Sequence, residues 1–348
     1  MNKISIILLA ISIAIISGCN SVNFPVYFEN TTREPIEIEI LRPADTIIDL
    51  SIKKILIFIK PGLVSNLSVI EGKTNLSGSF QLSDLPGTEF RSMAELLSAS
   101  PRFELLEATG TIRPPAGKNY DWEELDSICT RAGVDACLFL DEQNILMGVS
   151  KPGIRNYDEG LSSNNNYSTG YIMFNSTYEF CCPKLKMSLT KTVKTGVSFQ
   201  AALDDFDSEF NSPEGVETLI HDYAAENGEK FSGWIAPVWQ RDTRNYFLKG
   251  NAELESVKPL VAEEKWEMVF EIWRRNMKSE SPSVAKHAFY NSIISYEMRG
   301  KLDSAVSITN EAYNRFKSEE FVDYGLILQE RLRESGVVNQ QLGISNRE

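Results

Sequence analysis

Histidine is scarce in this sequence of 348 residues: the chain has only His221 and His287, far apart along its length. Histidine is a common general base and metal ligand, so a catalytic or metal site built on histidine is not expected. Cations are also outnumbered, because 35 Lys and Arg stand against 48 Asp and Glu, for a formal net charge of −13. A chain without a cationic excess has little means of neutralising phosphates, and we therefore expect no nucleic-acid partner.

Motifs that carry chemistry are missing as well. Gly72-Lys73-Thr74 resembles the end of a phosphate loop, but Leu67 stands where the first glycine of that loop is needed. The acidic run Asp204-Asp205-Phe206-Asp207 lacks the glycine and the distal glutamate of a calcium loop. The sequence therefore predicts no catalytic residue, no metal and no cofactor.

Cysteine is infrequent. Apart from Cys19, the chain has Cys129, Cys137 and the adjacent pair Cys181 and Cys182, and no CxxC motif. A long chain with few cysteines does not depend on disulfides, although an oxidising compartment would permit them. Because two of the four fall in a predicted helix and an apolar strand, we favour packing in the core as small hydrophobic residues.

No apolar run reaches the about 20 residues that a membrane-spanning helix needs. The run from Ile4 to Ile16 follows Lys3 and ends at Ser17-Gly18-Cys19, which is typical of a secretory signal, and an uncleaved anchor helix is the alternative. Ile16-Ser17-Gly18-Cys19 resembles the lipobox of bacterial lipoproteins. The resemblance implies a signal peptide over 1–18, a lipid on Cys19, a tether over 19–34 and attachment to the bacterial outer membrane. No acidic cluster follows Cys19, which favours the periplasmic face.

Strand and helix patterns alternate over residues 35–240. Residues 36–40 alternate with period two, whereas 52–59 and 134–140 are continuous apolar runs typical of strands covered on both faces. Helices are expected over 88–98 and from Asp121, and an antiparallel pair over 171–180 and 184–190. These patterns predict a front α/β domain with a mixed sheet, interrupted by a polar loop over 150–170.

The region 245–335 resembles a tetratricopeptide helix pair. Phe289, Asn291 and Tyr296 take the aromatic and polar positions of the first helix, Gly300 the turn, and Ala305 a small position of the second. The resemblance implies an all-α tetratricopeptide-like helical domain, followed by a tail over 336–348. Two helix pairs do not close a core alone, so we expect them to lean on the front domain.

The segment 233–241 is the expected seam between the two domains. Trp234 and Trp239 flank Pro237 there, and aromatic residues beside a proline at a junction favour buried packing; an exposed binding platform is the alternative. The candidate partner-binding residues are Trp234, Trp239, Arg241 and Tyr296.

The order of these features resembles a family of uncharacterised bacterial envelope lipoproteins. The resemblance rests on the lipobox, Leu41-Arg42-Pro43-Ala44, Gly133-Val134-Asp135-Ala136, the Pro237-Val238-Trp239 seam and the Trp266 and Trp273 helix. Members of that family have no assigned activity, so the resemblance implies the architecture and not the function. We expect a lipid-anchored envelope protein that acts on other envelope proteins as an interaction or assembly module, without catalysis. The alternative is a periplasmic hydrolase or glycan-binding protein with a site at the end of the α/β sheet.

Overall fold

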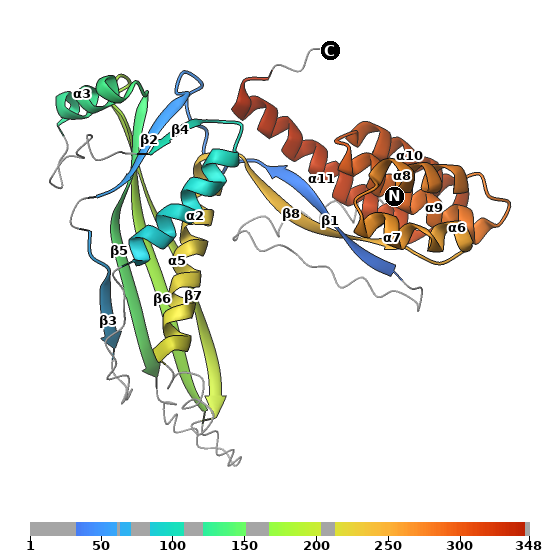
Figure 1. Cartoon of the computed structure of the whole chain (residues 1–348), viewed down its shortest axis with the longest axis horizontal. Helices are drawn as coiled ribbons and strands as arrows, with labels where there is room; N and C mark the ends of the chain where they lie inside the picture. Colours follow the sequence, from blue (N-terminus) through green and yellow to red (C-terminus); the bar gives the residue numbers. More distant parts are fainter. Residues whose placement is uncertain are drawn as a thin grey trace, which may run out of the picture.

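The computed structural model describes residues 33–60, 63–70, 84–107, 121–150, 167–202 and 213–344. Within these ranges the chain forms a front body around a mixed β-sheet, followed by an all-helical region (Figure 1). The predicted fold class is therefore confirmed. Cys19, the expected signal peptide, and most of the expected tether and polar loop lie outside the described residues; the last two residues predicted as tether, 33–34, belong to a strand.

The front sheet is mixed. Its strand order is β4-β2-β5-β6-β7, with β3 paired to β5 beyond the end of β2. The pairings of β5 with β2 and β3, and of β2 with β4, are parallel, whereas β5, β6 and β7 are antiparallel. The strands are β2 Lys54–Ile59, β3 Asn66–Ile70, β4 Glu104–Glu107, β5 Ala136–Ser150, β6 Tyr167–Cys182 and β7 Met187–Ala202.

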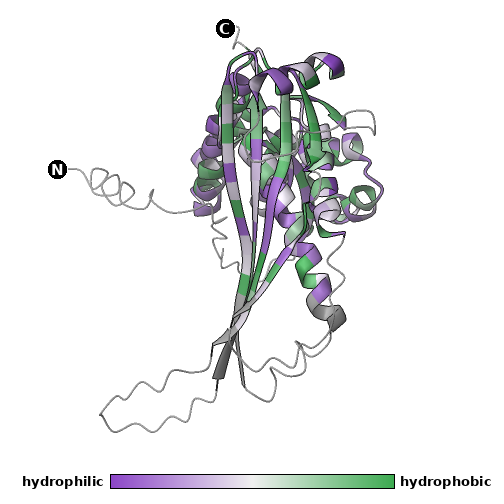
Figure 2. Ribbon diagram, turned by 90° about the vertical axis from the view of Figure 1, so that its left-hand side faces the viewer, coloured by the Kyte–Doolittle hydropathy of each residue, from purple (hydrophilic) through white to green (hydrophobic). Residues whose placement is uncertain are grey.

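Helices cover both faces of the sheet where β2 pairs with the start of β5. Helices α2 (Leu85–Ala99) and α5 (Pro213–Ile235) pack on the face that carries Ile55 and Leu138. Helix α3 (Trp122–Ala132) packs on the opposite face, which explains why β2 and the start of β5 are apolar on both sides. In Figure 2 the long strands run down the face toward the viewer, and α5 and the helical region lie behind them.

Helix α3 has the ends that its sequence predicts. The Asp121 carboxylate accepts the backbone N–H of Glu123, which satisfies a donor that the first helical turn leaves free. Gly133 ends the helix with φ 69°, a left-handed conformation that residues other than glycine adopt at a cost.

A two-stranded ribbon stands apart from the front sheet. Strands β1 (Arg33–Arg42) and β8 (Val238–Phe247) pair antiparallel, with Arg33 opposite Phe247. The strand expected over 36–40 thus forms, but it pairs with β8 and not with the mixed sheet. Its pattern explains this, because Ile36, Ile38 and Ile40 are buried and the glutamates between them are exposed, as in a strand covered on one face only.

The helical region stacks consecutive helices, as the tetratricopeptide resemblance implies. Helices α8, α9, α10 and α11 each contact the next one along the chain. Their core holds Trp273, Phe289, Ala305 and Ala312, and it also includes Ile36, Tyr246 and Phe247 of the ribbon. The helices are α6 Ala252–Glu255, α7 Val257–Ala262, α8 Trp266–Asn276, α9 Pro282–Met298, α10 Leu302–Phe316 and α11 Glu319–Leu342, so the last one continues into the predicted tail.

Candidate functional site

The β1–β8 ribbon has two different faces. The inner face, toward α9 and α11, buries the isoleucines of β1 together with Arg244 and Tyr246 of β8. The outer face exposes Trp239 and Arg241, and the register places Glu39 opposite Arg241 and Leu41 opposite Trp239. Since side chains alternate across a strand, fixing the inner face also fixes which residues face outward.

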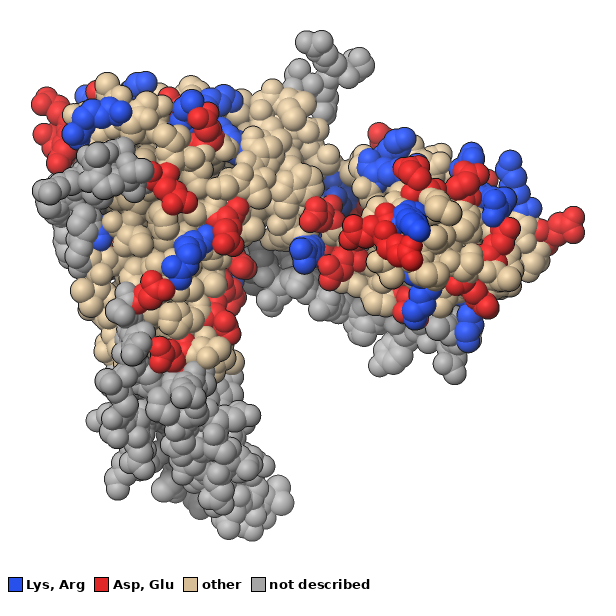
Figure 3. Space-filling view, in the orientation of Figure 1, with Lys and Arg blue, Asp and Glu red and all other residues tan. Residues whose placement is uncertain are grey.

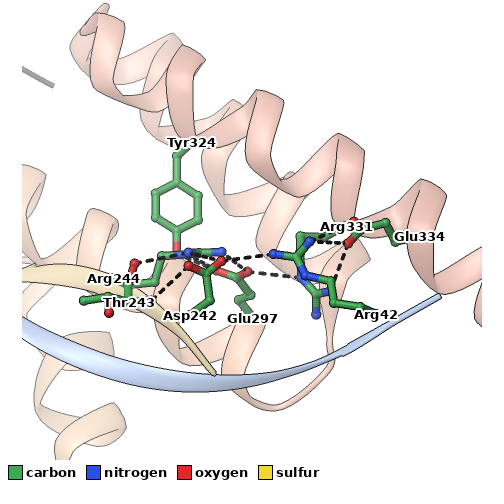
Figure 4. A network of polar contacts seen from close by, with 8 residues as sticks. All are labelled: Arg42, Asp242, Thr243, Arg244, Glu297, Tyr324, Arg331 and Glu334. Atoms are coloured by element: carbon green, nitrogen blue, oxygen red, sulfur yellow. Dashed lines mark hydrogen bonds and ion pairs between the residues drawn. The ribbon is translucent and has the colours of Figure 1, made fainter. Parts of the chain in front are cut away.

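A buried ion pair holds the inner face (Figure 4). Arg244 donates from Nε and Nη2 to the two carboxylate oxygens of Glu297 on α9, at 3.0 and 2.8 Å. The Tyr324 hydroxyl on α11 donates to Glu297 Oε2 at 2.7 Å. Burial alone would lower the pKa of Arg244, but the charge and hydrogen bonds of Glu297 outweigh it and raise that pKa. Arg244 therefore stays charged, and β8, α9 and α11 meet at the Glu297 carboxylate.

The ion pair is part of a larger network in which the numbers of arginines and carboxylates are equal. Asp242 Oδ2 accepts from Arg244 Nη1 at 2.8 Å and from Arg42 Nη2 at 3.3 Å. Arg42 also donates from Nη1 to both carboxylate oxygens of Glu334 on α11, at 2.8 and 2.7 Å, and Arg331 lies 3.4 Å from Glu334. Three arginines thus meet three carboxylates among the residues of Figure 4. Losing Arg244 would leave the buried charge of Glu297 without its bidentate partner, so this pair fixes the position of the ribbon.

Two side-chain amides complete the attachment of the ribbon. Asn291 on α9 accepts the N–H of Phe247 and donates to its carbonyl oxygen, both at 2.8 Å. Gln341 on α11 does the same for Ala44, at 2.9 and 2.7 Å. Each amide satisfies a backbone donor and acceptor as a neighbouring strand would. The polar position that the helix-pair resemblance assigned to Asn291 thus has a structural role.

The structure brings two of the four candidate partner-binding residues together. Trp239, expected to be buried at the seam, is 44% exposed, and the exposed Arg241 lies on the same face of β8, 3.9 Å from Glu37. Trp234 is half-buried, because α5 continues to Ile235 and includes it; its ring is tilted against that of Phe231, with the centroids 5.5 Å apart. Tyr296 packs against the core of the helical region on α9, so neither belongs to this surface.

Both histidines make structural contacts. His287 stacks on Phe247 with ring centroids 4.1 Å apart, and its Nδ1 lies 2.8 Å from the carbonyl oxygen of Lys249. His221 Nδ1 lies 3.1 Å from the Thr88 hydroxyl, which joins α5 to α2. The residues that the structure describes contain no group of three or more metal-ligating side chains.

The front body also contains a buried carboxyl that the sequence did not predict, Glu89 on α2. It is fully buried and accepts hydrogen bonds from Gln143 at 2.6 Å, from Ser176 at 2.8 Å and from the Tyr178 hydroxyl. Burial raises the pKa of Glu89 to about 7, against the three hydrogen bonds that lower it. A bulge in β5 between Leu140 and Glu142 adjoins the strand segment that supplies Gln143. A glutamate within a predicted helix is ordinary, so nothing in the sequence indicated that Glu89 contacts polar side chains of β5 and β6.

Comparisons with known proteins give families without an assigned activity, as expected. A family model described as Domain of unknown function (DUF8603) matches residues 69–247, and one described as Domain of unknown function (DUF6340) matches residues 255–330. No curated protein matches the sequence.

Solved structures show weak similarity. A structure described as a neuraminyllactose-binding hemagglutinin homolog from Helicobacter pylori is 8% identical, with a TM-score of 0.28, over 54% of this chain and 87% of that one. The PelC dodecamer from Paraburkholderia phytofirmans is 11% identical, with a TM-score of 0.24, over 58% and 99%. At these TM-scores the similarities carry no argument about function.

Proposed function

The chain belongs to the family described as Domain of unknown function (DUF8603), whose model matches more than half of it, and from this premise we propose that it is a protein–protein interaction or assembly module without catalysis. The observation that carries the proposal is the exposure of Trp239 on a ribbon whose other face is fixed by buried ion pairs. Tryptophan and arginine are enriched at the energetic centres of protein interfaces, and this ribbon presents both side by side.

The surface also indicates the chemistry of its partner. Around Trp239 the outer face carries Glu37, Glu39 and Arg241, so carboxylates outnumber cations there as they do in the whole chain. We propose a protein partner with an apolar recess for the indole and basic side chains that meet the two glutamates. Because the ribbon is already held by α9 and α11, docking costs little conformational entropy. On the face seen in Figure 3, Lys and Arg are interspersed with Asp and Glu, which does not favour a phosphate-rich partner.

The proposed location is the periplasmic face of the bacterial outer membrane, through a lipid on Cys19. The proposal rests on the lipobox-like Ile16-Ser17-Gly18-Cys19 and on the short apolar run before it. Among the described residues, no helix has the length and hydrophobicity that crossing a bilayer requires. Several acyl chains, at about 0.8 kcal/mol for each buried CH₂ group, would hold the protein on the membrane.

The anchor is tested by Cys19→Ala. We expect the variant to leave the outer-membrane fraction, because it has no thiol to carry the lipid, and we expect the mass of the purified wild type to include acyl chains. A Cys19→Ala variant that still fractionates with outer membrane, beside a wild type without acyl mass, would contradict the anchor.

A hydrolase or glycan-binding site remains the weaker proposal. Its best acid is Glu89, whose pKa of about 7 suits proton transfer near neutral pH. The side chain is fully buried between α2 and the sheet and is held by three donors, so a substrate could not contact it without displacing the helix.

The docking surface is tested by site-specific photocrosslinking in native envelopes. A photoreactive residue replaces Arg241 in one variant and Met268, a 55% exposed apolar residue on α8, in a matched control. We expect a defined adduct from position 241, lost when Trp239→Ala is added, and no such adduct from position 268. Equal adducts from both positions, or an adduct at 241 that survives Trp239→Ala, would contradict the proposed surface.

A further inference from the structure

Three of the four described cysteines meet in one apolar core. Cys129 on α3, Cys137 on β5 and Cys181 on β6 belong to the cluster between α3 and the sheet. Cys137 and Cys181 are directly opposite each other in the antiparallel ladder. Cys182, the next residue, points to the other face of the sheet and belongs to the core under α2 and α5.

The sulfurs of Cys129 and Cys137 are in contact. Their Sγ atoms lie 3.4 Å apart, and the two residues are 2% and 0% exposed. The other two sulfurs have different partners, since Cys181 Sγ lies 3.6 Å from the Ser188 hydroxyl and Cys182 Sγ 3.4 Å from the carbonyl oxygen of Asp135. A disulfide has an S–S distance of about 2.05 Å, so the first pair needs to close by only about 1.4 Å.

The turn between the two residues holds this approach in place. Gly133 ends α3 in a left-handed conformation, and the backbone N–H of Val134 bonds to the carbonyl oxygen of Cys129. The Asp135 carboxylate then accepts the backbone N–H groups of Lys53 and Lys54 at the start of β2, at 2.9 and 3.0 Å. The last turn of α3 is therefore fixed over the first residues of β5 by contacts that do not involve the thiols.

We infer that Cys129 and Cys137 form a disulfide when the chain folds in the presence of a disulfide oxidant such as oxidised glutathione. One of the two thiolates attacks the glutathione disulfide, which releases one glutathione thiolate and leaves a mixed disulfide on that cysteine. The thiolate of the other cysteine then attacks the protein sulfur of the mixed disulfide and releases the second glutathione. Two thiols lose two protons and two electrons, and one glutathione disulfide is reduced to two glutathione molecules.

The burial of the two thiols determines when the reaction takes place. In the folded chain, a hydrogen bond from Cys137 lowers the pKa of Cys129, against the burial that raises it, whereas that bond and burial raise the pKa of Cys137. These shifts come from native contacts, so they do not decide which thiol attacks first during folding. Glutathione cannot reach thiols this deeply buried, so the exchange takes place during folding and is slow in the reduced native protein.

The test is disulfide mapping of the full chain carrying Cys19→Ala, which removes the remaining thiol. The reduced, denatured protein is refolded in a glutathione redox buffer, alkylated and cleaved with trypsin, which places Cys129 in peptide 119–131, Cys137 in 132–155 and the other two in 156–184. We expect peptides 119–131 and 132–155 to be joined, with Cys181 and Cys182 alkylated. Four alkylated thiols, or a bond between 132–155 and 156–184, would overturn the inference.

Two further measurements distinguish the loss of the disulfide from a failure of a variant to fold. Cys181→Ala should retain the linked peptides and Cys129→Ala should lose them. Reduction of the refolded protein should lower its melting temperature by about 5 °C, because the crosslink restricts the unfolded chain. An unchanged melting temperature on reduction would contradict the inference even if the variants fail to fold. The inference depends on the proposed function in one respect, the oxidising compartment in which the chain would fold. The mapping experiment requires neither the lipid nor a partner, so the disulfide and the proposed function can fail independently.

Discussion

Glu89 makes the stability of the front body depend on pH below neutrality. Its pKa is about 7 in the folded chain and about 4.5 as an ordinary carboxyl, because burial disfavours its charge. Between these values the folded state holds a proton that the unfolded state has lost. The free energy of unfolding therefore falls as pH rises from about 4.5 to about 7 and levels off above, by about 3 kcal/mol for this group.

Glu89→Gln removes this dependence. The amide cannot ionise, and the hydroxyls of Ser176 and Tyr178 can accept from it as well as donate to it. We expect the variant to match the wild type near pH 5 and to be more stable by up to about 3 kcal/mol at pH 8, in urea unfolding at both pH values. A variant with the same pH profile as the wild type would show that Glu89 is not the titrating group.

The attachment of the ribbon to the helices is the element on which the docking surface depends. Arg244→Ala leaves the fully buried Glu297 without its bidentate partner, so we expect the free energy of unfolding to fall by about 3–5 kcal/mol. The matched control is Arg274→Ala, which breaks an exposed pair with Glu271 and should cost at most about 1 kcal/mol. Equal losses in denaturant unfolding of the two variants would mean that the network contributes no more than a surface pair.

The elements that depend on local pattern could be predicted, and those that depend on tertiary pairing could not. Strand β2 was found because its residues are apolar on both faces. The expected seam over 233–241 overlaps strand β8, which the sequence did not predict. The inner face of β8 carries Asp242 and Arg244, charges that pair with each other and with the distant Arg42 and Glu297, so it lacks the apolar pattern of a buried strand. The exposure of Trp239 follows from that missed strand, since period two places it on the outer face.

At the scale of the whole molecule, two segments that are far apart in the sequence contribute side chains to the core of the helical region. Strands β1 and β8 flank the front body in sequence, yet Ile36 and Tyr246 are part of the helical core. The expectation that the helices cannot close a core alone therefore takes a specific form: the missing surface comes from the ribbon. The sequence pattern does not reveal that β1 and β8 supply this surface, because it depends on the pairing of two strands that are far apart in the sequence.

The isolated fragment 245–348 should accordingly fail to form a cooperative core. It lacks β1 and most of β8, so Glu297 loses Arg244 and the apolar surface under Ile36 is exposed. We expect a broad thermal transition by near-ultraviolet circular dichroism, where the full chain melts sharply. A sharp transition of the fragment at the melting temperature of the full chain would show that the helices are independent.

The most direct measurement of the central claim compares the partner affinity and the melting temperature of Trp239→Ala. An exposed interface tryptophan contributes to binding and little to folding, so we predict an affinity at least about 30-fold weaker, which corresponds to about 2 kcal/mol, with a melting temperature within about 1 °C of the wild type. Met268→Ala, at a similarly exposed apolar side chain, should change neither quantity. A lowered melting temperature with unchanged affinity would contradict the account, because it would make Trp239 a packing residue and not the centre of a docking surface.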